Sequence, residues 1–258
     1  MNREDLVPGL HAVREALIHQ EMKIRRILIK KGKHGGRVDE IIGMAEARSI
    51  PIQWKEAYEL EQFLPDVAHQ GVIAVIASFS YIALDDLLDR CHQSRQPRLV
   101  LAADHITDEG NLGALVRTAA FFGIQGLVLP RDRSAGVTGK ILKRSSGAFL
   151  HLPVARVVNL GRALDRFKKA GFWVIGAAEG GKTSIYGFDW DRDVILVLGS
   201  ENKGISRFVK SQCDESVCIP SWGHVPSLNV SVAGGIILSE IVRQRNEKTS
   251  RPTNHKTA

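Results

Sequence analysis

The segment Arg98-Leu-Val-Leu-Ala-Ala-Asp104, with the run Asn111-Leu-Gly-Ala-Leu-Val-Arg117-Thr-Ala-Ala-Phe-Phe-Gly123 that follows it, sets the fold class of this chain. The first is a short apolar run typical of a buried strand. The second spaces its apolar residues as a helix does and ends in glycine. The alternation continues, with strands expected at residues 126–130, 172–178, 194–200 and 217–220 and helices at 139–150, 160–171 and 229–245. Apolar strands between helices predict an α/β domain with a mainly parallel sheet covered on both faces.

The residues before Arg98 alternate in the same way on a smaller scale. Helical spacing is found at 9–20, 36–49 and 57–65, and strand-like runs at 24–30, 50–54 and 69–79. We therefore expect a small αβ domain over residues 1–78, and a helix or linker over 79–97 that ends at Pro97. The larger domain then spans residues 98–246. Residues 247–258 lack large apolar side chains and are expected to form a disordered tail.

The composition is that of a globular protein, with 44% hydrophobic and 24% charged residues. Acidic residues occur early in the chain and no apolar run is found there, so no secretory signal is expected, and no apolar run is long enough to span a membrane. The three cysteines (Cys91, Cys213 and Cys218) show no metal-ligand spacing. These features predict a cytoplasmic protein with reduced thiols and no metal.

The charge balance favours a polyanionic partner. The formal net charge is +7, and releasing counterions from phosphates would give such a chain affinity for nucleic acid. One basic run contains no acidic residue: Lys23, Arg25, Arg26, Lys30, Lys31, Lys33 and Arg37. It is interpreted either as an RNA-binding surface or as a solvated face, and the charges alone do not decide between the two.

One motif match is misleading. Residues 176–183 (GAAEGGKT) fit the phosphate-binding pattern GxxxxGK[ST] and follow a strand-like segment. A phosphate site of this kind needs a helix to open at once, so that its N-terminal amides face the phosphate. The following residues, SIYGFDWDRD, contain a glycine, aromatic residues and turn formers. We therefore interpret the match as a coincidental turn.

Three other segments place polar residues and glycines after an apolar strand, where open α/β sheets bind ligands. The first (104–119) contains Asn111, which could cap the helix, and Gly113, which could leave room for a ligand beside Arg117. The second (198–206) places glycines on both sides of Glu201. The third (219–235) enters a helix through Ser227-Leu-Asn229. Helix caps, a surface arginine and a plain turn are the alternative interpretations.

Taken together, in this order and spacing, the three segments resemble the three signature motifs of the SpoU (TrmH) family of SPOUT RNA methyltransferases. NLGALVRTAAFFG is similar to the first, LGSENKGIS to the second and IPSWGHVPSLNVSVAGG to the third. GLHAVREAL and HQGVIA resemble the L30e-like RNA-binding domain that precedes the knot in 23S rRNA guanosine-2′-O-methyltransferases. The resemblance implies a C-terminal α/β trefoil-knot domain that binds S-adenosyl-L-methionine (AdoMet), works as a homodimer and acts on structured RNA.

The resemblance also implies roles for individual residues. Backbone around Gly199, Ile219, Leu228 and Asn229 would hold AdoMet, and five residues fall on the polar active-site positions: Asn111, Arg117, Glu201, Ser227 and Asn229. Because a guanidinium stays protonated, Arg117 is expected to bind the phosphate next to the reacting ribose and to orient the 2′-hydroxyl. Asn111 and Glu201 would then fix that geometry.

The predicted activity is therefore AdoMet-dependent 2′-O-methylation of a guanosine in 23S rRNA. The same chemistry could instead act on tRNA or confer rRNA-directed antibiotic resistance. A non-catalytic RNA-binding protein of ribosome assembly is the alternative from another functional class.

Overall fold

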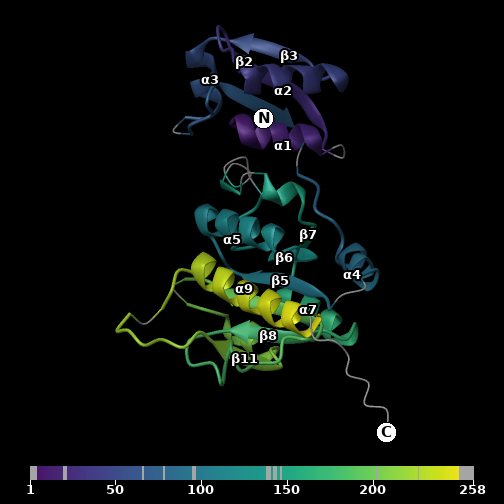
Figure 1. Ribbon diagram of the computed structural model, residues 1–258, viewed down its shortest axis with the longest axis vertical. Helices are drawn as coiled ribbons and strands as arrows, with labels where there is room; N and C mark the ends of the chain where they lie inside the picture. Colours follow the sequence, from purple (N-terminus) through teal and green to yellow (C-terminus); the bar gives the residue numbers. More distant parts are fainter. Residues whose placement is uncertain are drawn as a thin grey trace. The chain divides into compact units, whose positions relative to one another are not determined.

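The computed structural model describes residues 5–19, 22–65, 67–77, 79–94, 97–137, 141, 144–145, 147–201, 203–225 and 227–249 (Figure 1). The chain forms two compact units. The first contains the described residues up to Tyr81 together with 108–117 and 135–152, and the second contains the rest.

The first unit is built on a four-stranded sheet in the order β1-β4-β2-β3. The strands are β1 (Asp5–Pro8), β2 (Ile24–Lys30), β3 (Ile52–Lys55) and β4 (Val72–Ile76), and the helices are α1 (Leu10–Ile18), α2 (Gly36–Ala47) and α3 (Ala57–Phe63). All five residues of β4 are buried, so helices cover both faces of this sheet. The sequence predicted this layering but missed β1, which pairs antiparallel with β4.

A single arginine closes the C-terminal end of α1. The Arg48 guanidinium donates to the carbonyl oxygens of Leu17 at 2.7 Å and of Met22 at 2.9 Å, and it also reaches those of Ala16 and His19. The last carbonyls of a helix have no partner within the helix, and a cation there also interacts favourably with the helix dipole. Arg48 therefore joins the end of α2 to the end of α1.

The second unit contains a seven-stranded sheet in the order β7-β6-β5-β10-β8-β11-β9. Its strands are β5 (Leu99–Asp104), β6 (Gly126–Pro130), β7 (Val154–Val157), β8 (Trp173–Ala177), β9 (Thr183–Ser184), β10 (Val194–Gly199) and β11 (Glu215–Cys218). Every pairing between these strands is parallel, as predicted. The short strand β7 was not predicted.

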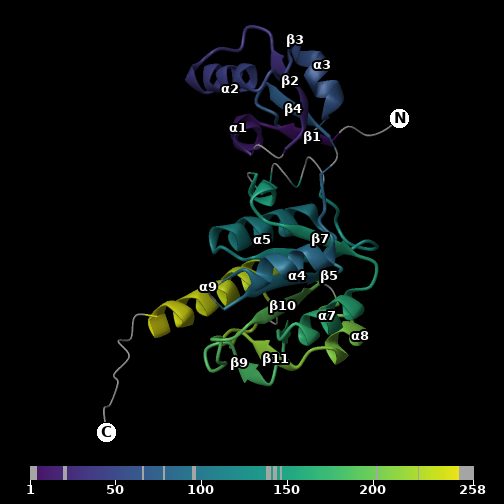
Figure 2. The ribbon, with the colours of Figure 1, turned by 90° about the vertical axis from the view of Figure 1, so that its right-hand side faces the viewer.

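Helices cover both faces of this sheet. α4 (Leu84–His92), α7 (Leu160–Lys169) and α8 (Arg207–Ser211) bury Leu87, Phe167 and Val209 in one core cluster with strand residues such as Ile195. Figure 2 shows α9 (Val230–Thr249) and α7 on opposite sides of β10. The remaining helix is α5 (Glu109–Phe121), and a 3-10 turn spans Ala148–Leu150. Part of the helix expected at 139–150 lies outside the described residues.

α9 runs to Thr249, so residues 247–249, which we had placed in the disordered tail, are helical. Residues 250–258 of that tail lie outside the described residues.

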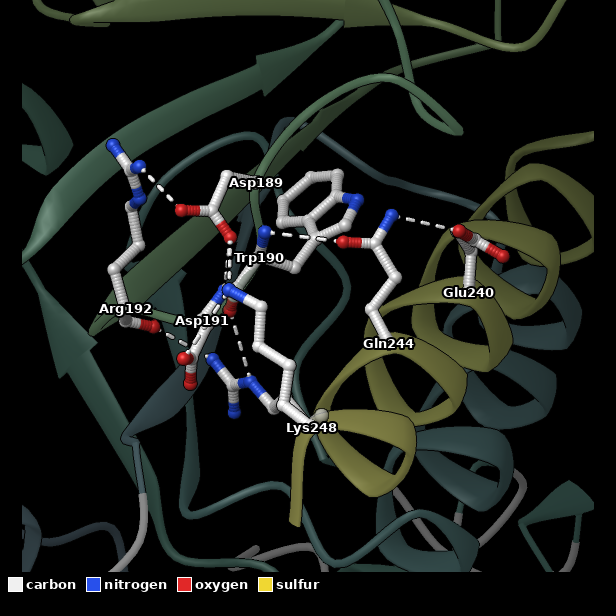
Figure 3. A network of polar contacts seen from close by, with 8 residues as sticks. Asp189, Trp190, Asp191, Arg192, Glu240, Gln244 and Lys248 are labelled. Atoms are coloured by element: carbon white, nitrogen blue, oxygen red, sulfur yellow. Dashed lines mark hydrogen bonds and ion pairs between the residues drawn. The ribbon is translucent and has the colours of Figure 1, made fainter. Parts of the chain in front are cut away.

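A polar network holds the C-terminal end of α9 (Figure 3). Lys248 bonds to Asp189 at 2.8 Å, and Gln244 accepts a hydrogen bond from the backbone of Trp190. Arg245 donates to the carbonyl oxygens of four residues: Pro97 at 2.7 Å, Arg192 at 2.8 Å, Trp190 at 3.1 Å and Arg98 at 3.3 Å. With its C-terminal half fixed in this way, α9 presents its N-terminal end at the carboxyl edge of the sheet.

Candidate active site

A cavity of about 890 Å³ opens at the carboxyl ends of β8, β10 and β11. This volume lies within the range of about 300–1,000 Å³ that is common for small-molecule sites. The walls come from the ends of β8, β10 and β11 and from the segment that leads into α9, and they include Glu179, Gly180, Gly199, Glu201, Ile219, Trp222, Ser227 and Leu228. The position agrees with the rule that open parallel sheets bind ligands at this edge.

The structure brings five of the predicted site residues together around this cavity: Gly199, Glu201, Ile219, Ser227 and Leu228. The side chain of Asn229 bonds to the first turn of α9. Its side-chain oxygen accepts from the Ser231 backbone N–H at 2.9 Å and from the Ser231 hydroxyl at 2.6 Å, so Asn229 caps α9. Of the two capping candidates in this segment, the structure therefore selects Asn229 and leaves Ser227 on the cavity wall.

The loop that carries Glu201 is held tightly. Ser200 and Gly204 exchange two backbone hydrogen bonds, of 3.1 and 2.8 Å. Gly199 packs so closely that a Cβ there would lie 2.0 Å from the carbonyl carbon of Gly204. No side chain fits at that distance, so the glycine is required for the loop to fold back on the strand.

A buried carboxylate fixes the far end of the same loop. Asp104, fully buried at the end of β5, accepts from the Ser206 backbone N–H at 2.6 Å. Its other oxygen lies 2.6 Å from Nδ1 of His105, a residue with a φ of 59°. Because Asp104 is opposite Gly199 in the register of β5 and β10, both ends of the loop are attached to one point of the sheet.

The cavity walls combine open backbone with charges of both signs. Added side chains at Gly180, Gly204 and Gly223 would meet no atom within 4 Å, so a ligand can approach the backbone directly at these three positions. Two carboxylates (Glu179 and Glu201) and two ammonium groups (Lys203 and Lys210) also line the cavity. This set of charged side chains suits a ligand that carries both an anionic and a cationic group.

Asn111 and Arg117 lie on α5, in residues that belong to the first unit. Two expectations about them are wrong. Asp108, not Asn111, caps α5, since Asp108 Oδ1 accepts from the Asn111 backbone N–H at 2.7 Å. Gly113 leaves no room for a ligand, because a Cβ there would lie 2.9 Å from Cβ of Arg144. Arg117 itself is exposed.

Most of the predicted basic run is exposed along β2 and the start of α2. Lys23, Arg25, Lys30, Lys31 and Arg37 are exposed, whereas Arg26 and Lys33 are half-buried. Lys31 is paired with Glu56 at 2.7 Å, and this hydrogen bond raises the pKa of Lys31. An anion that binds at Lys31 would therefore compete with Glu56.

The structure agrees with our rejection of a phosphate-binding loop. β8 is followed by a turn and the short strand β9, and residues 178–190 contain no helix. Sequence reasoning nevertheless missed that Ala177–Gly180 form part of the cavity wall. The glycine pair at the end of an apolar strand was the available signal.

No group of three or more possible metal ligands was found in the described part of the chain. No helix found there has the length and apolar character that a membrane span requires.

Comparisons with known proteins agree on one family. The SpoU rRNA Methylase family matches residues 98–239, and a family described as RNA 2′-O ribose methyltransferase substrate binding matches residues 6–82. A tRNA/rRNA methyltransferase of Synechocystis is 41% identical over 98% of this chain and 66% of its own length. YacO of Bacillus subtilis, named for the TrmH family of tRNA/rRNA methyltransferases, is 36% identical over 95% of this chain and 97% of its own.

Solved structures give the same result. The SpoU methyltransferase AviRb from Streptomyces viridochromogenes, in complex with AdoMet, is 28% identical and has a TM-score of 0.78 over 94% of this chain and 91% of its own. A TrmH/SpoU tRNA modifying enzyme of A. aeolicus is 31% identical, with a TM-score of 0.55 over 67% of this chain and 88% of its own. With its N-terminal substrate-binding domain and its parallel-sheet methylase domain of the SPOUT class, this chain belongs to the SpoU (TrmH) family of AdoMet-dependent RNA 2′-O-methyltransferases.

Proposed function

We propose that this protein methylates the ribose 2′-hydroxyl of one guanosine in 23S rRNA, and that it does so in the cytoplasm as a homodimer. The observation that carries the proposal is the cavity at the carboxyl edge of the sheet. Residues of the second and third family motifs, distant in sequence, meet there around one volume of suitable size.

In this proposal the cavity holds AdoMet. Backbone at Gly199, Ile219 and Leu228 would contact the adenosine and methionine parts, and the carboxylates and ammonium groups of the wall suit a zwitterion. When bound, AdoMet supplies an electrophilic methyl group on a sulfonium. The chain's own contribution is to hold the loop of Glu201 rigid through Asp104 and to keep that loop against Gly199.

Arg117 is proposed to bind the phosphate beside the reacting ribose. An exposed guanidinium can make two parallel hydrogen bonds to a phosphate, and it does not give up its proton near neutral pH. Its role is therefore to orient the 2′-hydroxyl and not to remove the hydroxyl proton. Asn111, Glu201, Ser227 and Asn229 complete the proposed polar set, with Asn229 acting through its cap on α9.

One observation favours rRNA over tRNA. The family that matches residues 98–239, more than half of the chain, is named for rRNA methylases. The residues of the substrate-binding domain, with the exposed basic run of β2, are proposed to recognise the shape of the rRNA.

The homodimer is proposed to form through α9. A groove of about 500 Å³ lies along this helix, and its lining includes Ser231, Gly235 and Ser239, whose small side chains let another helix approach closely. Val232, on the same groove, is 49% exposed. Val232→Glu should therefore yield monomers in light scattering, with Arg162→Glu on the exposed surface of α7 as the matched control. A dimer that persists in Val232→Glu would exclude this face.

Methyl transfer from labelled AdoMet to undermodified 23S rRNA tests the proposed activity, with tRNA as the parallel substrate and mapping of the modified ribose. Label on one guanosine 2′-hydroxyl of 23S rRNA is the expected result. Arg117→Ala should abolish the transfer while AdoMet affinity stays unchanged. Arg117→Lys should also be strongly impaired, because an ammonium cannot form the forked contact. Label on tRNA alone would overturn the substrate.

A further inference from the structure

Trp222 is the most exposed large hydrophobic side chain in the described part of the chain, at 89%. It stands on the loop between β11 and α9 and lines the proposed AdoMet cavity. Two further apolar side chains of this loop are exposed: Val225 at 71% and Leu228 at 48%. An indole left in water next to a ligand cavity indicates a partner that covers it in the working state.

We propose that the Trp222 indole stacks on a nucleobase of the RNA substrate, either that of the target nucleotide or that of a direct neighbour. This inference rests on the proposed methylation of RNA. The methyl group leaves AdoMet for a ribose hydroxyl, so the acceptor ribose must reach the mouth of the cavity. Its base then lies within one nucleotide of the cavity rim, where Trp222 stands.

A nucleobase fits this position better than other occupants. Sequence-specific RNA recognition uses unstacked bases, which aromatic side chains cover face to face. Tryptophan offers the largest such face and can stack on any base. Gly223 follows Trp222 directly, and a Cβ there would meet no atom within 4 Å, so the space beside the indole is open. The hydroxyl of Ser221 donates to the carbonyl oxygen of Gly223 at 3.4 Å, which gives the loop around the indole a local constraint.

Three variants separate stacking from simple apolar contact. Trp222→Ala removes the face, Trp222→Leu keeps an apolar side chain without an aromatic face, and Trp222→Phe keeps a smaller face. Stacking of one base predicts that the KM for 23S rRNA rises roughly 5- to 150-fold in the Ala and Leu variants. The Phe variant should retain most of the affinity for RNA. Because the indole is 89% exposed, the Kd for AdoMet should change far less than the KM for RNA in all three variants.

Trp173→Leu is the matched control. This tryptophan is 44% exposed but begins β8, at the opposite edge of the sheet, under the guanidinium of Arg192. It should leave the KM for RNA unchanged. A direct readout comes from the difference in fluorescence between wild type and Trp222→Phe. Short single-stranded RNA should quench the Trp222 emission, whereas the same ribose-phosphate backbone without bases should not.

The outcomes distinguish this inference from the proposed function. Methylation by the wild type with an unchanged KM in Trp222→Ala would overturn the stacking and leave the activity in place. Base-dependent quenching without any methyl transfer would keep the stacking and overturn the activity. A loss of AdoMet affinity alone in Trp222→Ala would show that the indole covers the cofactor instead. A change in oligomeric state would show that a second copy of the chain covers it. Either of these last two results overturns the inference.

Discussion

The contact at Gly199 allows a quantitative prediction for Gly199→Ala. The added methyl carbon would lie 2.0 Å from the carbonyl carbon of Gly204, 2.2 Å from the nitrogen of Ile205 and 2.3 Å from the oxygen of Gly204. Ordinary contact begins at 3.4 Å. All three atoms are backbone, so no rotamer change relieves the clash. The loop must move away from β10 by more than 1 Å.

That movement acts against the bonds that define the loop. Two backbone hydrogen bonds join Ser200 and Gly204, and Asp104 accepts from the Ser206 N–H at 2.6 Å. Net contributions of about 0.5–1.5 kcal/mol for each neutral bond and about 1.5–3 kcal/mol for the charged one set the scale. We therefore expect a total cost of about 3 kcal/mol or more, divided between unfolding free energy and AdoMet binding. An AdoMet Kd at least tenfold higher corresponds to about 1.4 kcal/mol of this.

Isothermal titration with AdoMet measures the loss of AdoMet affinity, and denaturant unfolding measures the loss of unfolding free energy. Gly187→Ala is the matched control, since the nearest atom to its added Cβ is the Ser184 oxygen at an ordinary 3.8 Å. Should Gly199→Ala fail to fold, Asp104→Asn tests the same loop without a clash, because it removes the carboxylate that Ser206 and His105 share. Unchanged AdoMet affinity and unchanged unfolding free energy in Gly199→Ala would refute the reasoning.

Three further predictions concern other parts of the chain. Arg48→Ala should lower the unfolding free energy by about 2–4 kcal/mol, measured by denaturant unfolding, because several helix-end carbonyls lose a charged donor; a loss below about 0.5 kcal/mol would contradict this role. Burial raises the pKa of the Cys91 and Cys213 thiols to about 11, so both should resist alkylation by iodoacetamide at pH 8. Cys218, on the cavity wall, should be alkylated first and be protected by AdoMet. Mass spectrometry with and without AdoMet measures the alkylation, and an equal rate of Cys218 labelling under both conditions would argue against AdoMet in this cavity. The hydrogen bond from Lys248, with that from Arg192, lowers the pKa of Asp189 from 3.8 to about 2, so the stability that these contacts contribute is present above pH 3.8 and is lost as the pH falls through about 2. Because both side chains are about half exposed, Lys248→Ala should lower the unfolding free energy only slightly at pH 7, and by progressively less as the pH falls through about 2. An equal cost at pH 7 and below pH 2 in denaturant unfolding would count against the ion pair.

The sequence predicted the parts of the fold that local patterns determine. Each buried strand of the large sheet is an apolar run, and runs between helices favour parallel pairing, so the meeting of the segments around Glu201 and Ser227 at one edge could be foreseen. The strand order could not be foreseen, because it does not follow the order of the strands along the chain. β10 lies between β5 and β8, whereas β6 and β7, which follow β5 directly in the sequence, lie on the other side of β5. The strand β7 was missed because it is only four residues long and contains Arg156.

The errors within the site have one physical cause, since each depends on a neighbour that sequence spacing does not reveal. The space beside Gly113 is filled by Arg144, which lies about thirty residues later. Asp108 and Asn111 are both good capping residues, and the actual start of α5 at Glu109 decides between them. Exposure cannot be read from a single aromatic residue either, so Trp222 became informative only through its place on the cavity wall.

The match of residues 176–183 to a phosphate-binding pattern has an explanation in packing. A Cβ at Gly176 would lie 2.9 Å from the sulfur of Cys213, and one at Gly181 would lie 2.4 Å from the carbonyl carbon of Val217. Both glycines therefore allow the chain to pass close to β11 and the turn before it, and neither is needed to leave room for a phosphate. The same turn then places Glu179 and Gly180 on the wall of the cavity. A pattern of glycines at a sheet edge thus indicates close backbone packing first, and the element that follows decides which ligand the edge can bind.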